Sequence, residues 1–113
     1  MTSDETRTRL PSFTITVTGP PHHALVALTG EVDMLTVPEL GMTLHKLLAD
    51  ERLHRLDLDL SELTFLDASG ISTIVGAHQA AVRTGCRLRL LRPRPHIRHV
   101  LHLTGVTGLC EVT

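Results

Sequence analysis

Apolar and polar residues alternate near the start of the chain in a way that predicts two strands. Phe13, Ile15 and Val17 alternate with threonines, which is the pattern of a strand with one buried face. Residues 24–28 form a short, continuously apolar run, which is typical of a second, more buried strand. Because residues 19–23 are rich in Gly, Pro and His and predict a turn, the two strands are expected to pair as a hairpin.

Helical spacing replaces this alternation in the next segment. Residues 36–39, T-V-P-E, have the form T-x-x-E, in which the Thr side chain caps a free backbone N–H and the Glu reaches back to the cap residue. Leucines then follow at helical spacing, at positions 40, 44, 47 and 48. We therefore expect an amphipathic helix from Thr36 to about residue 49, with Thr36 and Glu39 forming a capping box.

The second half of the chain switches repeatedly between strand and helix patterns. Residues 56–60 alternate strictly between Leu and Asp, which predicts a strand with three buried leucines and two aspartates on a polar face. A helix is expected from about Ser69 to Arg83, because Gly85 supplies a natural helix stop. A short strand is expected over residues 87–91, a third helix over residues 97–104 and a last short strand over residues 109–112.

The resulting order, β-β-α-β-α-β-α-β, predicts an α/β fold. Strands that alternate with helices favour a mixed sheet with parallel pairs, and here the helices should pack mainly on one face. The length of 113 residues suits a single domain. We expect the polar residues 1–11 to form a flexible N-terminal arm and residues 12–113 to form the domain.

The composition argues against several classes of function. The chain has no Trp or Tyr and only two Phe, so it lacks the aromatic side chains on which nucleic-acid bases commonly stack. Its apolar runs are too short to span a membrane, and its start has no apolar core of a secretory signal. We therefore expect a cytoplasmic protein without a direct nucleic-acid or membrane partner. In that compartment Cys86 and Cys110 should be reduced core residues.

Charge is distributed unevenly, although the net charge is only −1. Residues 31–67 contain nine acids and three Lys or Arg, whereas residues 83–110 contain six arginines and no acid. Two solvated faces are the simpler interpretation, and a face that orients a partner of opposite charge is the alternative. The basic segment could bind phosphate groups, but no nucleic-acid motif accompanies it, so a solubilising edge strand is favoured. Its arginines are Arg87, Arg89, Arg92, Arg94 and Arg98.

Candidate catalytic and metal-binding residues are few. His96, His99 and His102 recur every third residue along the third helix, where a solvated face is favoured over a weak zinc site. Phosphate-binding, nucleophile-elbow and C-x-x-C motifs are absent from the sequence. Asp67 and Ser69 have no base nearby in sequence, although His78 could approach them in space. We expect no enzyme, no cofactor and no metal site.

Four segments resemble the STAS domain family, of the anti-sigma factor antagonist type. Residues 28–33, L-T-G-E-V-D, are similar to the family's L-x-G-E-L-D turn after the second strand. Residues 58–70 are similar to its strand–loop–helix signature, which ends in D-S-S-G, and residues 85–88 and 97–106 resemble its fourth strand and third helix. The resemblance runs from about Phe13 onward and implies a STAS-like single domain.

The resemblance also implies a function. In this family the residue after the motif Asp is usually a Ser or Thr, which a partner anti-sigma factor of the ATP-dependent serine-kinase type phosphorylates. A phosphate adds about −1.5 to −2 charges at pH 7, which ends the binding. The expected function is therefore that of a bacterial signalling protein that binds such a kinase and influences sigma-factor-dependent transcription.

The phosphorylated position is occupied here by Ala68, whose methyl group cannot accept a phosphoryl group. Ser69 matches the second Ser of the motif, and a helix-capping role is favoured over phosphorylation, because one residue of offset turns a helical side chain by about 100°. We therefore hypothesise that the domain is an antagonist whose binding is not switched off by phosphorylation. The implied partner-binding residues are Glu31, Asp33, Asp67, Ala68, Ser69 and Gly70.

Alternatives stay open at this point. Asp33 and Asp67 could serve only as caps of nearby helices. The domain could instead sense a small anion or nucleotide at the helix start and the arginine segment. A third interpretation is a scaffold member of a multi-protein signalling particle, with contacts to a second copy or a paralogue.

Overall fold

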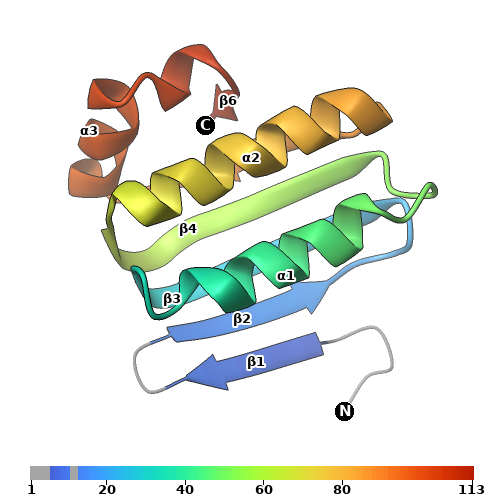
Figure 1. The fold of residues 1–113 in the computed structure, drawn as a ribbon, viewed down its shortest axis with the longest axis horizontal. Coiled ribbons are helices and arrows are strands. Elements are labelled where there is room, and N and C mark those ends of the chain that lie inside the picture. The colour runs from blue at the N-terminus through green and yellow to red at the C-terminus, as the bar shows by residue number, and fades with distance from the viewer. Residues whose placement is uncertain (1–5, 11–12) are drawn as a thin grey trace.

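A six-stranded sheet organises the part of the chain that the computed structural model describes, residues 6–10 and 13–113 (Figure 1). Its strands are β1 (Thr6–Leu10), β2 (Phe13–Thr18), β3 (His23–Val32), β4 (Arg55–Leu66), β5 (Arg87–Leu91) and β6 (Glu111–Val112). The helices are α1 (Val37–Leu48), α2 (Ala68–Thr84) and α3 (Pro95–Leu103), followed by the 3₁₀ turn η1 (Val106–Gly108).

The strands lie in the sheet in the order in which they occur in the chain. β1, β2 and β3 pair antiparallel, which confirms the predicted hairpin of β2 and β3. From β3 to β6 the neighbours are parallel, because a helical segment separates each strand from the next. The mixed sheet predicted from the sequence is therefore confirmed.

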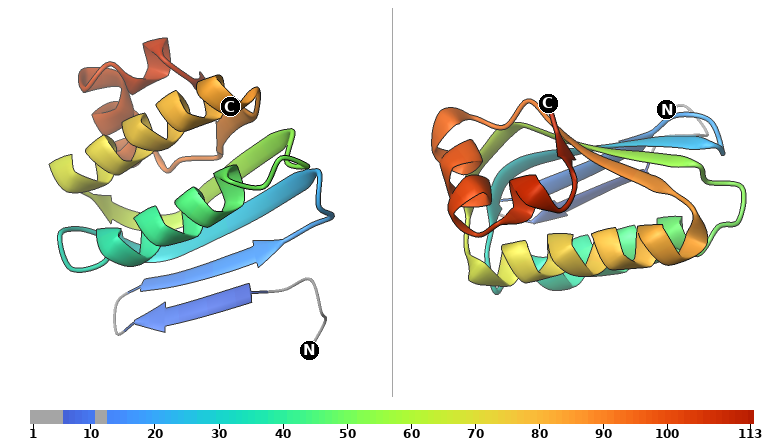
Figure 2. Two further views of the ribbon diagram at one scale, coloured as in Figure 1. Left: turned by 45° about the vertical axis from the view of Figure 1, so that its right-hand side comes forward. Right: turned by 90° about the horizontal axis from the view of Figure 1, so that it is seen from above.

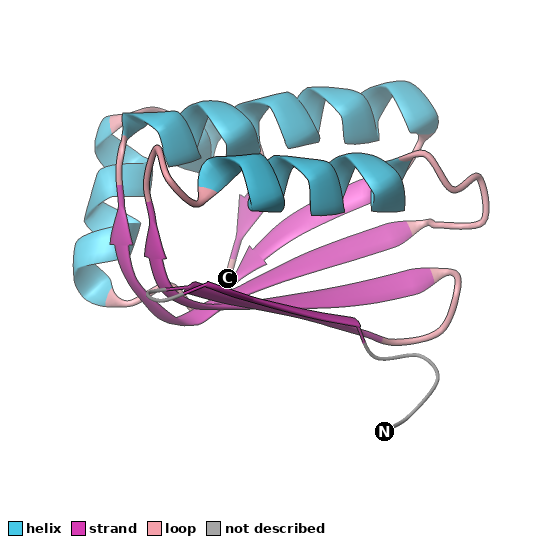
Figure 3. Ribbon diagram, turned by 60° about the horizontal axis from the view of Figure 1, so that its bottom comes forward, coloured by secondary structure: helices cyan, strands magenta, loops and turns pink. Residues whose placement is uncertain are grey.

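The helices cover one face of the sheet and leave the other open (Figures 2 and 3). α1 and α2 lie side by side across the covered face, and α3 lies at one end of it. Strand alternation then separates the side chains of β4: Leu56, Leu58 and Leu60 are fully buried beneath the helices. The fully buried core also includes Phe13, Ile15, Leu28, Leu40, Leu44, Leu63, Ile74, Leu90 and Ile97.

Both cysteines belong to this core. Cys86 and Cys110 are free and buried, which confirms their predicted position in the core. Burial raises the pKa of both thiols, so each behaves as a small apolar side chain near neutral pH.

Residues 6–10 differ from the sequence-based prediction. They form β1, in which Thr6 pairs with Val17 and Leu10 pairs with Phe13, so the predicted flexible arm does not hold for them. Pairing with β2, and not the composition of the segment, makes these residues the edge strand of the sheet. Residues 1–5 and 11 of the predicted arm lie outside the described residues, and the domain boundary at residue 12 stays a prediction.

β3 and β4 are also longer than predicted, which positions the loops that follow them. The prediction ends the two strands at residues 28 and 60, whereas they continue to Val32 and Leu66. Their pairing shifts register between Ala27 and Thr29 and again after Gly30. Gly30 has a φ of 99°, a conformation that favours glycine, so the G of the G-E-V-D segment allows the strand to continue through this irregularity.

The open face of the sheet carries a buried carboxylate. Asp57 lies on the polar face predicted from the Leu-Asp alternation, but it is only 2% exposed. Arg89, its direct neighbour on β5, donates from Nε and Nη2 to the two carboxylate oxygens, both at 2.8 Å. The Nε2 atom of His23 on β3 lies 2.8 Å from Asp57 Oδ2. Cross-strand partners therefore replace water around this charge.

The other arginines of the basic segment are largely paired as well. Arg87 contacts Glu111 at 2.6 Å, and two further pairs, Arg92 with Asp59 and Arg94 with Glu62, each measure 2.9 Å. The interpretation of this segment as a solubilising edge strand is wrong, because β5 lies between β4 and β6. Most of its positive charges are therefore paired with acidic side chains of the same domain.

Acid is expected to destabilise the protein. The hydrogen bond from Arg89 and, after it, that from His23 lower the pKa of Asp57 in the folded state, despite its burial. The unfolded chain takes up its proton near pH 4, the ordinary range for Asp, and the folded chain does so at lower pH. The free energy of unfolding should therefore hold above about pH 5 and decrease as the pH falls through the folded-state pKa.

Urea unfolding across a pH series measures this effect. The matched control is Asp57→Asn, whose stability should be lower at neutral pH and should change less between about pH 5 and pH 3. Parallel pH profiles for the two proteins would contradict the assignment to Asp57.

Candidate partner-docking site

Two loops meet where β3 and β4 end. The strands are parallel, and Val32 lies opposite Leu66 at their carboxyl ends. The backbone N–H of Asp67 donates to the carbonyl of Val32 at 3.2 Å, which ties the two loops together. Asp33 and Asp67 therefore begin neighbouring loops, and both loops lead into helices at the same end of the sheet (Figure 1).

Asp67 holds the start of α2. Its Oδ1 atom accepts hydrogen bonds from the Ser69 hydroxyl at 2.6 Å and from the Gly70 N–H at 3.0 Å. These two donors, the Ser69 hydroxyl first, lower the pKa of Asp67. The predicted capping role of Ser69 is wrong, because the longer Asp side chain one residue before the helix reaches the free N–H. Ser69 instead fixes the orientation of that carboxylate.

Asp33 organises the other loop in a similar way. Its Oδ1 atom accepts from the N–H of Leu35 at 2.9 Å and from the N–H of Thr36 at 3.3 Å. The capping box predicted for Thr36 and Glu39 does not form, because the Thr36 hydroxyl is turned away from the helix. It donates to the Glu31 carbonyl at 3.0 Å and accepts from the Asp33 N–H at 2.9 Å. Asp67 therefore caps α2, whereas Asp33 orders the turn that precedes α1.

Exposed apolar side chains border the two aspartates. Leu35 is 85% exposed and Met34 is 76% exposed, and both follow Asp33 directly. Phe65, two residues before Asp67, is also exposed and lies opposite Glu31 in the β3–β4 register. This apolar group was not predicted from the sequence, although Met34 and Leu35 are visible there as two large apolar residues between a strand and a helix. Such exposed groups are common where proteins bind partners.

Ala68 and Gly70 complete the start of α2. Ala68 is exposed, so the position that carries the hydroxyl in the motif presents only a methyl group to solvent. Gly70 is buried, and a Cβ atom there would press on Leu66 Cδ1 and lie 2.7 Å from Val32 Cγ1. Gly70 thus lets the helix approach the two strand ends closely.

Gly70→Ala is accordingly expected to destabilise the fold by about 1–3 kcal/mol through overpacking. Chemical denaturation followed by circular dichroism measures the change. Gly76→Ala on the same helix is the control, because no atom lies within 4 Å of its added Cβ, and it should be neutral or stabilising. Equal behaviour of the two variants would show that the contact at residue 70 relaxes without cost.

The remaining candidate residues lie elsewhere. His78 follows Ser69 by nine positions on α2, which is more than two helical turns along the axis. His96 turns toward β4, where its Nε2 atom lies 2.7 Å from the Thr64 carbonyl oxygen. Within residues 6–10 and 13–113, no group of three or more His, Cys, Asp or Glu side chains is placed to hold a metal ion.

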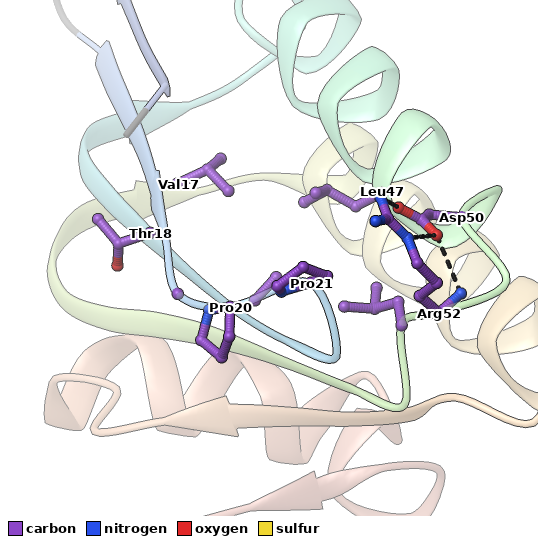
Figure 4. A pocket seen from close by; sticks show the side chains of 10 residues that line it. Val17, Thr18, Pro20, Pro21, Leu47, Asp50 and Arg52 are labelled. Atoms are coloured by element: carbon purple, nitrogen blue, oxygen red, sulfur yellow. Dashed lines mark hydrogen bonds and ion pairs between the residues drawn. The ribbon is translucent and has the colours of Figure 1, made fainter. Parts of the chain in front are cut away.

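A small pocket lies away from the two loops, between the β2–β3 turn and the end of α1 (Figure 4). It measures about 240 Å³ and is lined mainly by apolar side chains, including Val17, Leu47 and Leu53. Asp50 and Arg52 form an ion pair of 2.9 Å at its side. Neither the predicted docking residues nor the arginines of β5 line this pocket.

Comparison with known proteins assigns the family. A family model described as "Mlab, STAS domain" matches residues 15–111. The chain belongs to the STAS domain family. The match includes both loops described above and all or part of every strand except β1, so the resemblance found in the sequence is confirmed.

Individual STAS proteins similar to this chain are regulators. An anti-sigma-B factor antagonist from Staphylococcus epidermidis is 29% identical over 87 residues, which cover 77% of this chain and 80% of that protein. A crystal structure of an anti-sigma factor antagonist from Mycobacterium paratuberculosis has a TM-score of 0.81 and 25% identity, and the match covers 93% of this chain and 89% of that one.

The fold is also that of the anti-sigma factor antagonist SpoIIAA. Its unphosphorylated form matches with a TM-score of 0.77 and 19% identity over 88% of this chain and 87% of that one. The phosphorylated form of the Bacillus protein matches with a TM-score of 0.70 over 88% and 90% of the two chains. None of the described helices of the present STAS domain is long and apolar enough to cross a membrane.

Proposed function

We propose that this STAS domain is an anti-sigma factor antagonist that binds a serine-kinase anti-sigma factor in the bacterial cytoplasm and thereby influences sigma-factor-dependent transcription. It acts by docking and not by catalysis. The observation that carries the proposal is the joined pair of loops after β3 and β4, in which two ordered aspartates stand beside exposed apolar side chains. Its relatives that are named as antagonists support the same role.

The geometry suits a partner surface that is both apolar and basic. Met34 and Leu35 supply apolar area, while Asp33 and Asp67 offer carboxylate oxygens held in place by backbone and hydroxyl donors. An interface of this type gains affinity from its apolar centre and orientation from its charges. We propose that Glu31, Asp33, Asp67, Ala68, Ser69 and Gly70 belong to this docking site, with Gly70 contributing through the backbone.

Ala68 should make the binding of the proposed antagonist insensitive to phosphorylation. The exposed methyl group leaves the kinase partner without an acceptor at the position that the motif normally phosphorylates. Ser69 is a poor substitute, because its hydroxyl donates at 2.6 Å to a carboxylate that would repel an incoming phosphate. We therefore propose that binding persists in the presence of ATP.

Leu35→Ser tests the position of the docking site. Since Leu35 is 85% exposed, its replacement should leave the fold intact while weakening binding to the anti-sigma factor about ten-fold or more, as expected for the loss of an apolar anchor. Isothermal titration calorimetry with the purified serine-kinase anti-sigma factor of the same organism measures the affinity.

The matched control is Val82→Ser, which removes an apolar side chain that is 66% exposed near the far end of α2. It should bind like the unmodified protein. Equal loss in both variants, or no loss in either, would refute the proposed docking surface.

A further inference from the structure

The outer face of α3 holds a basic cleft that the docking function does not use. The cleft measures about 400 Å³ and is lined by Pro95, Arg98, His99 and His102 of α3, with Thr107 of η1 closing the other side. The opposite face of the helix buries Ile97 and Leu101 in the core. The packing of Ile97 and Leu101 therefore directs the cleft-lining face of α3 toward solvent. α3 and η1 together form one corner of the molecule (Figure 1).

Arg98 differs from the arginines that precede it. Arg87, Arg89, Arg92 and Arg94 each contact an acidic side chain of β4 or β6. For Arg98 no acidic partner exists among residues 6–10 and 13–113, and its side chain is exposed. The guanidinium that lines the cleft thus keeps its donors available.

The surroundings of the cleft add no negative charge. Residues 68–110 contain no Asp or Glu, so α3 and η1 carry only basic or neutral side chains. Two acidic residues lie on elements that contact this region, and each is already paired with an arginine. Glu111 accepts from Arg87, and Glu62 accepts from Arg94. The local field therefore favours an anion.

The donor groups in the cleft match a phosphate group. A guanidinium offers two parallel N–H donors to phosphate oxygens, two imidazoles add N–H donors, and a hydroxyl can donate a further bond. Arg98 and His102 are four residues apart and lie on one helical face, and Thr107 approaches from the next turn. We propose that this cleft between α3 and η1 binds a phosphate monoester, with Arg98 as the principal contact.

Nuclear magnetic resonance titration with inorganic phosphate tests the site. At constant pH and ionic strength, phosphate should cause saturable shifts of the Arg98, His99 and His102 signals, whereas the same concentration of chloride should not. Arg98→Ala should weaken phosphate binding about ten-fold, the loss expected for one charge-assisted contact. Shifts that do not saturate, or that occur equally with chloride, would overturn the proposal.

Arg83→Ala is the matched control, because Arg83 is an exposed arginine near the end of α2 that likewise has no acidic partner among the described residues. It should leave phosphate affinity unchanged, and an equal loss in both variants would indicate a non-specific charge effect that overturns the site. Phosphoserine and adenosine monophosphate then distinguish the source of the phosphate. Tighter binding of phosphoserine indicates a modified protein, and tighter binding of the nucleotide indicates a nucleoside phosphate. Tighter binding of acetate than of phosphate would contradict the assigned ligand class.

Discussion

Replacing Asp57 by Ala is expected to lower the free energy of unfolding by about 2–4 kcal/mol. The substitution leaves Arg89, whose side chain is only 23% exposed, without its two hydrogen-bonded oxygens. The loss stays below that of a fully buried pair, because Arg89 retains some solvent contact and has Glu111 at 3.9 Å. Urea unfolding at neutral pH measures the difference.

Glu62→Ala is the control for this variant. Glu62 pairs with Arg94 at a similar distance, but its side chain is 65% exposed, so its loss should cost less than about 1 kcal/mol. The double variant Asp57→Leu with Arg89→Met should recover much of the stability, because a packed apolar pair leaves no unpaired charge. A cost for Asp57→Ala no larger than that for Glu62→Ala would contradict the assigned role of the pair.

Ala68→Glu is expected to weaken binding to the anti-sigma factor by about two orders of magnitude. The new carboxylate would stand next to Asp67 in the proposed docking site, where it adds an unpaired negative charge, as a phosphate does at this position of the family motif. The helix should tolerate it, because residue 68 lies in the first turn of α2, where acidic side chains are favourable. Surface plasmon resonance measures the affinity.

Val82→Glu supplies the comparison, because it places the same charge on an exposed position near the other end of α2. It should bind nearly as tightly as the unmodified protein. Retained affinity of Ala68→Glu, or equal loss in both variants, would exclude a close contact at Ala68.

Local patterns were sufficient to predict most of the fold. Alternation in β2 and β5, leucine spacing in α1 and the glycine after α2 each depend on neighbouring residues, and the structure has these elements where they were expected. The ends of β3 and β4 were predicted too early, since their final residues are held by pairing with each other across a long sequence separation. β1 was missed for the same reason, because its partner strand and not its composition makes it a strand.

The charged residues show a similar limit. The sequence places Asp57 and Arg89 on separate strands, but only the register of β4 and β5 brings them opposite each other. Thr36 matches a capping box by spacing, yet its hydroxyl is used by the Glu31 carbonyl because β3 extends further than predicted. At the candidate site, the order of Asp67, Ala68 and Ser69 was visible in the sequence, whereas the exposure of Leu35 required the loop conformation.

In the proposed function, the docking site binds a serine-kinase anti-sigma factor, and phosphorylation does not switch this binding off. Its most direct test is to incubate the protein with that kinase and ATP, and then to record intact mass and binding affinity, with Ala68→Ser as the control that restores an acceptor. We predict unchanged mass and affinity for the unmodified protein, and one added phosphoryl group with loss of binding for Ala68→Ser. A phosphoryl group on Ser69 of the unmodified protein, accompanied by loss of binding, would contradict the account.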